Sequence, residues 1–291
     1  MESRLEFKGT GRELFKQLFV GALLTGITLG IYGPWFLVKL VRYVTSVSTI
    51  RNTPRGDLTL EYDATGGALF KEGLITGLLT VITLGIYTPW MIARMLRFHQ
   101  THSKAVDAQG TTYQLRGNLQ GGELASTVLV GMLLSAITLT LYMPWSLVKL
   151  QKLIAQKTEL VADGQIIGHL DYSGEGGKLF ATMFVGQLLT IITFGIYAPW
   201  FQVKMLQFNL NHTEIHIHGG QIIRGDFDGA GNELFVMNLV GGILTGLTLG
   251  IYGFWFMAKV MQYQFAHTSY RNTGRPSLPS LPAYGAGLAT A

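Results

Sequence analysis

The sequence of 291 residues contains no cysteine and few charged residues. The absence of cysteine excludes disulfides, thiolate catalysis and cysteine-ligated metal sites. Lys, Arg, Asp and Glu together make up 13% of the chain, about half of the roughly 25% that is usual in soluble proteins. Hydrophobic residues account for 48%, and the mean hydropathy is +0.31. This composition is typical of a membrane protein.

The chain also lacks the short motifs that mark common enzymes. No glycine-rich dinucleotide motif follows a predicted strand, no phosphate-binding loop occurs, and no serine lies in a nucleophile elbow. The carboxylates, such as Glu61, Asp171 and Asp228, fall mainly in polar connecting segments. We therefore predict no catalytic residue, no metal and no cofactor.

The chain does contain one apolar block that recurs five times. The blocks end at tryptophans that are 55 residues apart, namely Trp35, Trp90, Trp145, Trp200 and Trp255. A constant spacing without insertions is typical of units that stack on one another in a closed arrangement. The sequence therefore predicts five tandem units of equal length.

Each unit contains a long apolar run that a glycine and a proline interrupt. Residues 14–31 make about 27 Å of helix, close to the roughly 30 Å of a hydrocarbon layer, and Gly33-Pro34 favours the start of a second helix. The alternative, one kinked helix over residues 14–48, is about 52 Å long and exceeds the bilayer. We predict membrane-spanning helical hairpins over about 13–48, 68–103, 123–158, 178–213 and 233–268.

The segments between the helical hairpins alternate apolar and polar residues, which indicates short β-strands. Residues 5–9 align with the second strand of such a β-hairpin, and residues 270–274 align with a first strand. We therefore predict that the two ends pair, complete the fifth β-hairpin and close a pseudo-fivefold ring. The predicted fold class is a predominantly α-helical integral membrane protein, with one membrane domain over residues 1–274 and a disordered tail over 275–291.

The basic residues lie mainly in the predicted strand segments and are absent from the Tyr-x-Pro-Trp turns. By the positive-inside tendency, the strand layer and both termini are expected on the cytoplasmic side of a bacterial inner membrane that the chain crosses several times. The same residues form no cluster that would predict binding to nucleic acid.

Two sets of basic residues on the second helix of each unit are candidate ligand-binding residues. The first set comprises Lys39, Arg94, Lys149, Lys204 and Lys259, and the second set, three residues further on, comprises Arg42, Arg97 and Lys152. This spacing puts both sets on one helix face. If that face points at the ring axis, the cations attract small anions or phospholipid headgroups. Alternatively, they reach the headgroups without lining an axial site.

Aromatic residues flank each turn and are predicted to lie at the membrane interface: Tyr32, Trp35, Tyr87, Trp90, Tyr142, Trp145, Tyr197, Trp200, Tyr252 and Trp255. Three histidines, His102, His212 and His267, share one position of the unit, but the other two units carry Val47 and Lys157 there. A metal site built by the repeat would keep its ligands in every unit, so we predict none.

The block Leu-Thr-x-x-Thr-Leu-Gly-Ile-Tyr-x-Pro-Trp at residues 24–35 recurs closely at 79–90 and 189–200, with Thr140 in place of glycine and Phe254 in place of proline elsewhere. This block resembles the YjgN-like bacterial inner-membrane family, a domain of unknown function. The resemblance implies a multi-pass membrane protein and brings no activity, ligand or catalytic residue.

We therefore expect a non-enzymatic membrane protein with one of two functions. The first is a channel or binding site for small anions or lipid headgroups along the ring axis. The second is a structural scaffold or accessory subunit of a membrane complex, without an open pore. The expected partners are membrane lipids, small anions or other subunits. An enzyme acting on lipid needs a nucleophile or a metal, and the repeat provides neither.

Overall fold

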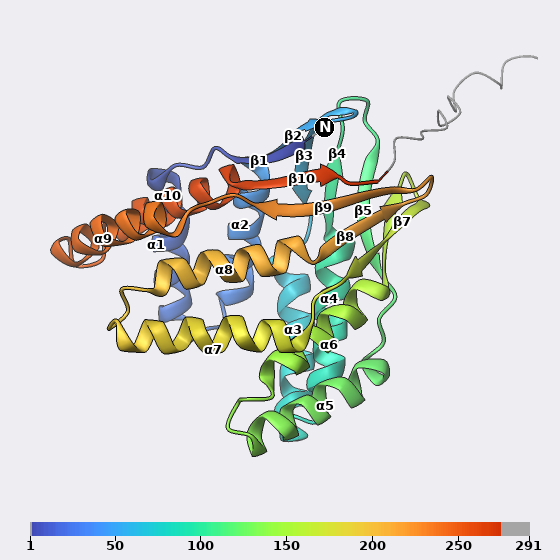
Figure 1. The fold of residues 1–291 in the computed structure, drawn as a ribbon, viewed down its shortest axis with the longest axis horizontal. Helices are drawn as coiled ribbons and strands as arrows, with labels where there is room; N and C mark the ends of the chain where they lie inside the picture. Colours follow the sequence, from blue (N-terminus) through green and yellow to red (C-terminus); the bar gives the residue numbers. More distant parts are fainter. Residues whose placement is uncertain (1, 275–291) are drawn as a thin grey trace, which may run out of the picture.

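In the computed structural model, which describes residues 2–274, the chain forms ten strands and ten helices in five similar units (Figure 1). The strands are β1 (Glu2–Phe7), β2 (Ser48–Thr53), β3 (Gly56–Tyr62), β4 (Ser103–Val106), β5 (Thr112–Gly117), β6 (Thr158–Ala162), β7 (Gln165–Tyr172), β8 (Thr213–Ile217), β9 (Gln221–Phe227) and β10 (Thr268–Asn272). The helices are α1 (Gly11–Ile27), α2 (Gly33–Ser46), α3 (Gly66–Ile82), α4 (Thr88–His102), α5 (Gly121–Ile137), α6 (Met143–Gln156), α7 (Gly176–Ile192), α8 (Ala198–Asn211), α9 (Gly231–Leu247) and α10 (Gly253–Ala266).

The strands form one antiparallel sheet that closes on itself. β1 pairs with β10, with Glu2 opposite Arg271 and Arg4 opposite Ser269, so the predicted pairing of the two chain ends is confirmed. The sheet is more continuous than predicted, because the strands on either side of each helical hairpin also pair, as β1 does with β2. The second layer is therefore a closed barrel and not five separate β-hairpins.

The two faces of the sheet differ in polarity. Leu5, Ile50 and Leu58 lie opposite one another across β1, β2 and β3, and Arg4 lies opposite Arg51 on the other face.

Because helical hairpins and tight turns alternate between antiparallel strands, all five helical hairpins extend from the same end of the sheet (Figure 1).

The core consists of separate clusters at the junctions between units. One cluster combines Val38 of α2 with Tyr62, Ala64 and Leu69 of the next unit. Another joins the last unit to the first, through Ala258 and residues of β1 and α1. Each unit therefore buries its apolar residues against its neighbours, as in repeat proteins.

The tryptophan of each unit packs against the first glycine of the next odd-numbered helix. A Cβ atom at Gly66 would lie 2.7 Å from the Cα of Trp35 and would overlap the indole ring. The last tryptophan, Trp255, packs in the same way against Gly11 and joins the two ends of the chain. The full set of pairs is Trp35–Gly66, Trp90–Gly121, Trp145–Gly176, Trp200–Gly231 and Trp255–Gly11.

The prediction of membrane-spanning helical hairpins is wrong. Among residues 2–274, no helix is both long enough and apolar enough to cross a membrane. α1 begins at Gly11, in a charged segment, and ends at Ile27. It ends there because Leu29 and Gly30 adopt positive φ angles of 51° and 92° and turn the chain. The fold is therefore a closed sheet that carries short helices, and a multi-pass topology with cytoplasmic termini is not supported. The predicted disordered tail, residues 275–291, lies outside the described residues.

Each helical hairpin has the same turn. A bulky residue at a φ of 47° to 51° precedes a residue at a larger positive φ, which is glycine in four units and Thr140, at 72°, in the third. In the first unit, the Thr28 hydroxyl accepts a hydrogen bond of 3.0 Å from the Tyr32 amide and fixes the start of α2. Residues other than glycine, asparagine and aspartate rarely adopt this backbone conformation.

The contact between tryptophan and glycine predicts opposite effects for two adjacent substitutions. Gly66→Ala lowers the free energy of unfolding by about 1–3 kcal/mol, because the new methyl group overlaps the backbone of Trp35. Gly67→Ala, at a position with open space around it, raises this free energy by about 0.5–1 kcal/mol. Denaturant unfolding measures both, and a loss of similar size in both variants would contradict the proposed contact.

The turn of the third unit predicts a stabilising substitution. Thr140→Gly raises the free energy of unfolding by about 1 kcal/mol, because glycine adopts the observed φ of 72° without strain. The reverse change at the matching position, Gly85→Thr, lowers it by a similar amount. Thermal unfolding of both variants tests this, and destabilisation by Thr140→Gly would show that the threonine side chain stabilises the turn.

Candidate functional site

Four residues of the first basic set bind the tyrosine of their own turn. The Lys39 ammonium donates a hydrogen bond of 2.8 Å to the Tyr32 hydroxyl, and Lys149 donates one of 2.9 Å to Tyr142. The third such bond, from Lys259 to Tyr252, is 3.2 Å long. The Nζ atoms of Lys39, Lys149, Lys204 and Lys259 lie 5.5, 5.6, 5.7 and 5.9 Å from the centroids of the tyrosine rings, which is within the range of a cation–π contact.

These four lysines keep their positive charge available for a ligand. All four side chains are exposed. Across residues 2–274, the ion pairs involve other basic residues and none of these four. A hydroxyl partner, unlike a carboxylate, does not compensate the charge of the lysine.

Arg94, the fifth member of the first set, has a carboxylate partner. Its guanidinium donates hydrogen bonds of 2.5 and 2.9 Å to the two carboxylate oxygens of Glu72 on α3. These bonds, followed by one to Tyr87, raise the pKa of Arg94. Glu72 is not among the site residues predicted from the sequence. A comparison of the five units could have indicated this pair, because the second unit alone combines an arginine in the first set with a glutamate 22 residues earlier.

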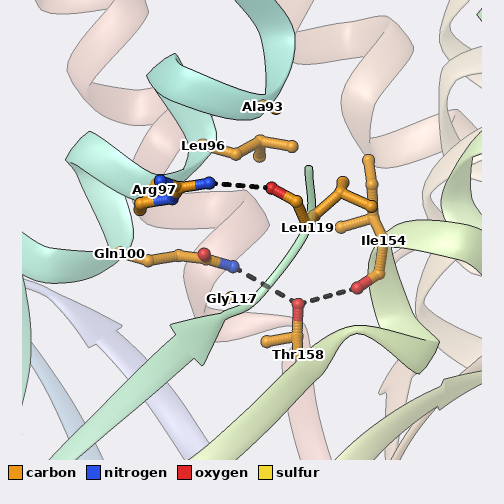
Figure 2. A pocket seen from close by; sticks show the side chains of 8 residues that line it. All are labelled: Ala93, Leu96, Arg97, Gln100, Gly117, Leu119, Ile154 and Thr158. Carbon is orange, nitrogen blue, oxygen red and sulfur yellow. Dashed lines mark hydrogen bonds between the residues drawn. The ribbon is translucent and has the colours of Figure 1, made fainter. Parts of the chain in front are cut away.

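The two arginines of the second basic set lie at contacts between units. Arg42 donates a hydrogen bond of 2.7 Å to the carbonyl of Ala64, which precedes α3. Arg97 donates one of 3.1 Å to the equivalent carbonyl of Leu119 (Figure 2). In the last unit, Gln262 reaches the same carbonyl position of the first unit, at Gly9, over 2.9 Å. A neutral amide thus makes the same contact, so the contact needs a donor and not a charge.

Two arginines of these sets line a cleft where α4 meets the start of α5. The cleft has a volume of about 530 Å³ and includes Arg94, Arg97, Asn118, Gln120 and Gly121. A narrower pocket beside it extends toward β6, where Gln100 donates a hydrogen bond of 3.4 Å to the Thr158 hydroxyl (Figure 2). Guanidinium groups bind phosphate and carboxylate oxygens through paired N–H donors. Because Glu72 already accepts the paired donors of Arg94, an anionic group in this cleft would meet mainly Arg97.

The aromatic residues of the turns make two kinds of contact in the structure. The tyrosines Tyr32, Tyr87, Tyr142 and Tyr197 stack on the tryptophans of the same turns, with ring centroids 5.8–6.3 Å apart. The tryptophans also form the contacts between units described above. Their placement at a membrane interface stays a prediction.

The three histidines that share one position of the unit each have a local partner. The Nδ1 atoms of His102 and His212 lie 2.8 and 2.6 Å from helix carbonyl oxygens, and that of His267 lies 2.6 Å from Asp228. The first two contacts lie at the C-terminal ends of α4 and α8, and the third links the end of α10 to the residue after β9. They explain why polar rings recur there without a shared ligand.

The repeated contact of the second set predicts which change at Arg97 the fold tolerates. Arg97→Gln changes the free energy of unfolding by less than about 0.5 kcal/mol, because an amide makes this contact in the last unit. Arg97→Ala lowers it by about 1–3 kcal/mol, since the Leu119 carbonyl loses its donor. Denaturant unfolding measures both, and equal losses would show that the charge of Arg97 matters to the fold.

Comparison with known proteins agrees with the resemblance seen in the repeated block. The sequence matches the family described as bacterial protein of unknown function (DUF898) over residues 2–76, 168–219 and 223–274. Two relatives, both named inner membrane protein YjgN, come from Salmonella typhimurium and Escherichia coli O157:H7. The first is 42% identical over 82 residues, which is 28% of this chain and 20% of the relative. The second is 41% identical over 69 residues, which is 24% of this chain and 16% of the relative.

The aligned segments thus span a fifth or less of these relatives. No solved structure matches the chain. The names of the relatives support the predicted location at the bacterial inner membrane. Because the family match covers more than half of the chain, the protein belongs to this YjgN-like family of bacterial proteins of unknown function.

Proposed function

We propose that this protein is a non-enzymatic component of the bacterial inner membrane that binds anionic phospholipid headgroups. The binding residues are Lys39, Arg94, Lys149, Lys204 and Lys259, which we call the basic belt. The observation that carries this proposal is the set of four exposed, carboxylate-free lysines at equivalent positions of a closed arrangement. Several weak charge contacts on one rigid body give a multivalent attachment to an anionic surface.

The basic belt borders segments that contain no charged residue. These segments are residues 17–38, 73–93, 124–148, 179–203 and 234–258, and each ends immediately before a residue of the belt. A lysine at the edge of an apolar surface places its stem along that surface and its ammonium group among headgroups. The order of charged and apolar residues along each helical hairpin thus matches the order of headgroups and acyl chains in a leaflet.

Of the two ligand classes that the sequence suggests, lipid headgroups fit this arrangement better than free small anions. Each lysine is held against the turn of its own helical hairpin, next to exposed apolar side chains. The cleft at Arg94 and Arg97 has room for a phosphate group, and it lies where one unit meets the next. The relatives named as inner membrane proteins agree with a lipid ligand.

Vesicle binding tests this proposal. We expect the protein to bind phosphatidylcholine vesicles more tightly when they contain phosphatidylglycerol, and added salt to reduce this preference. The double variant Lys39→Gln/Lys204→Gln weakens binding to the anionic vesicles about tenfold or more, since each juxtamembrane charge contributes about 1 kcal/mol. Sedimentation of the vesicles with bound protein measures the change.

The matched control removes two charges from the strand layer. Arg55→Gln/Arg116→Gln carries the same change in net charge but leaves the basic belt intact, and it keeps the affinity within about twofold. Equal losses in the two double variants would refute a role for the belt. Release of chloride from the same vesicles that depends on the belt lysines would support an anion channel instead.

A further inference from the structure

The five helical hairpin turns expose large apolar side chains almost completely. The fractions exposed are 93% for Leu29, 93% for Leu84, 85% for Leu139, 98% for Phe194 and 94% for Leu249. An isolated exposed leucine needs no explanation, but the same exposure at one position of all five units does.

The backbone conformation at these five positions makes a large apolar residue unexpected there. All five residues have φ angles of 47° to 51°, where bulky side chains are disfavoured and asparagine or glycine is preferred. A large apolar side chain at this position is therefore unfavourable for the turn itself. Since almost no surface of these side chains contacts the rest of residues 2–274, the folded chain gains little from them. A contact outside the chain accounts for both observations.

The exposed surface continues from each turn along the odd-numbered helix. On α1 it includes Phe19, Val20, Leu23 and Ile27, which are 49%, 50%, 52% and 70% exposed. The charged residues of α1, such as Lys16, lie nearer the sheet. From residue 19 to the end of α1 the helix rises about 12 Å. This height is close to that of one leaflet's hydrocarbon, about half of roughly 30 Å.

We propose that the five helical hairpin turns insert into the acyl region of a single leaflet, with the basic belt at the level of its headgroups. This inference rests on the membrane attachment of the proposed function and names the part of the lipid that the turns contact. A bilayer fits better than a second copy of the chain, because the turns of different hairpins lie apart from one another (Figure 1). Separate apolar turns with a basic border are complementary to a fluid anionic leaflet.

Substitution by asparagine separates membrane insertion from folding. Leu29→Asn removes the apolar side chain and suits the left-handed backbone, so the variant folds with equal or higher thermal stability. We expect about tenfold weaker binding to phosphatidylcholine vesicles for one such turn, and no detectable binding when all five residues are asparagine. The control Ile166→Asn changes an apolar residue on β7 that is 46% exposed, and it leaves binding unchanged.

The absence of cysteine allows site-specific depth measurement on the whole chain. A nitroxide on Leu29→Cys is expected to become accessible to oxygen and protected from a water-soluble nickel chelate when vesicles bind. A nitroxide on Arg55→Cys, in the tight turn between β2 and β3, is expected to stay accessible to the chelate. A Leu29 label that remains accessible to the chelate on bound protein would overturn insertion.

Two further results distinguish failure of the insertion proposal from failure of headgroup binding by the basic belt. If the asparagine variants lose self-association in sedimentation analysis but still bind vesicles as before, a second copy covers the turns and the inference is overturned. If the belt variants keep their preference for anionic vesicles while the Leu29 label is buried, headgroup binding by the belt is refuted and insertion of the turns stands.

Discussion

The packing of each tryptophan on the first glycine of the next unit is the contact on which the closed arrangement depends. The glycine is required because a Cβ atom would overlap the tryptophan backbone as well as its ring. The tryptophan and the glycine come from adjacent units and the segment between them has the same length each time, so this contact accounts for part of the constant spacing of the repeats. Trp255 of the last unit makes this contact with Gly11 of the first unit. The two units are therefore joined through their helices as well as through the pairing of β1 with β10.

Closure also separates the polar and apolar parts of the molecule. In an antiparallel sheet whose strands are joined alternately by helical hairpins and tight turns, every helical hairpin leaves from the same end. The charge-free segments are therefore gathered at that end, and pairs such as Arg51 with Glu6 stay on the sheet. The low charge content of the whole chain is thus a property of one end of the structure.

The sequence predicted the units, their two helices and two strands, and the pairing of the chain ends, because each depends on local pattern and on the phase of the repeat. It failed on where the first helix of each unit begins and ends, and on membrane spanning, since Leu29 is apolar and its left-handed backbone could not be read from hydropathy. The pairing between β1 and β2 was missed because it depends on how the helical hairpins pack. For the site, the sequence placed the cations on the correct helices, but not the bond between Arg94 and Glu72, which requires the geometry of the α3–α4 hairpin.

The tyrosine of each turn links the apolar turn to the charge of the belt. Tyr32 immediately precedes the second helix of its unit, and its hydroxyl accepts a hydrogen bond from Lys39, two helical turns further on, so the ammonium group is held at a fixed height above Leu29. The same seven-residue separation in four units sets their lysines at one level relative to their turns. A planar leaflet presents headgroups and acyl chains at just such a fixed separation. In the second unit Glu72 compensates the charge of Arg94, so in the proposed attachment the attraction to an anionic surface is assigned mainly to the other four units.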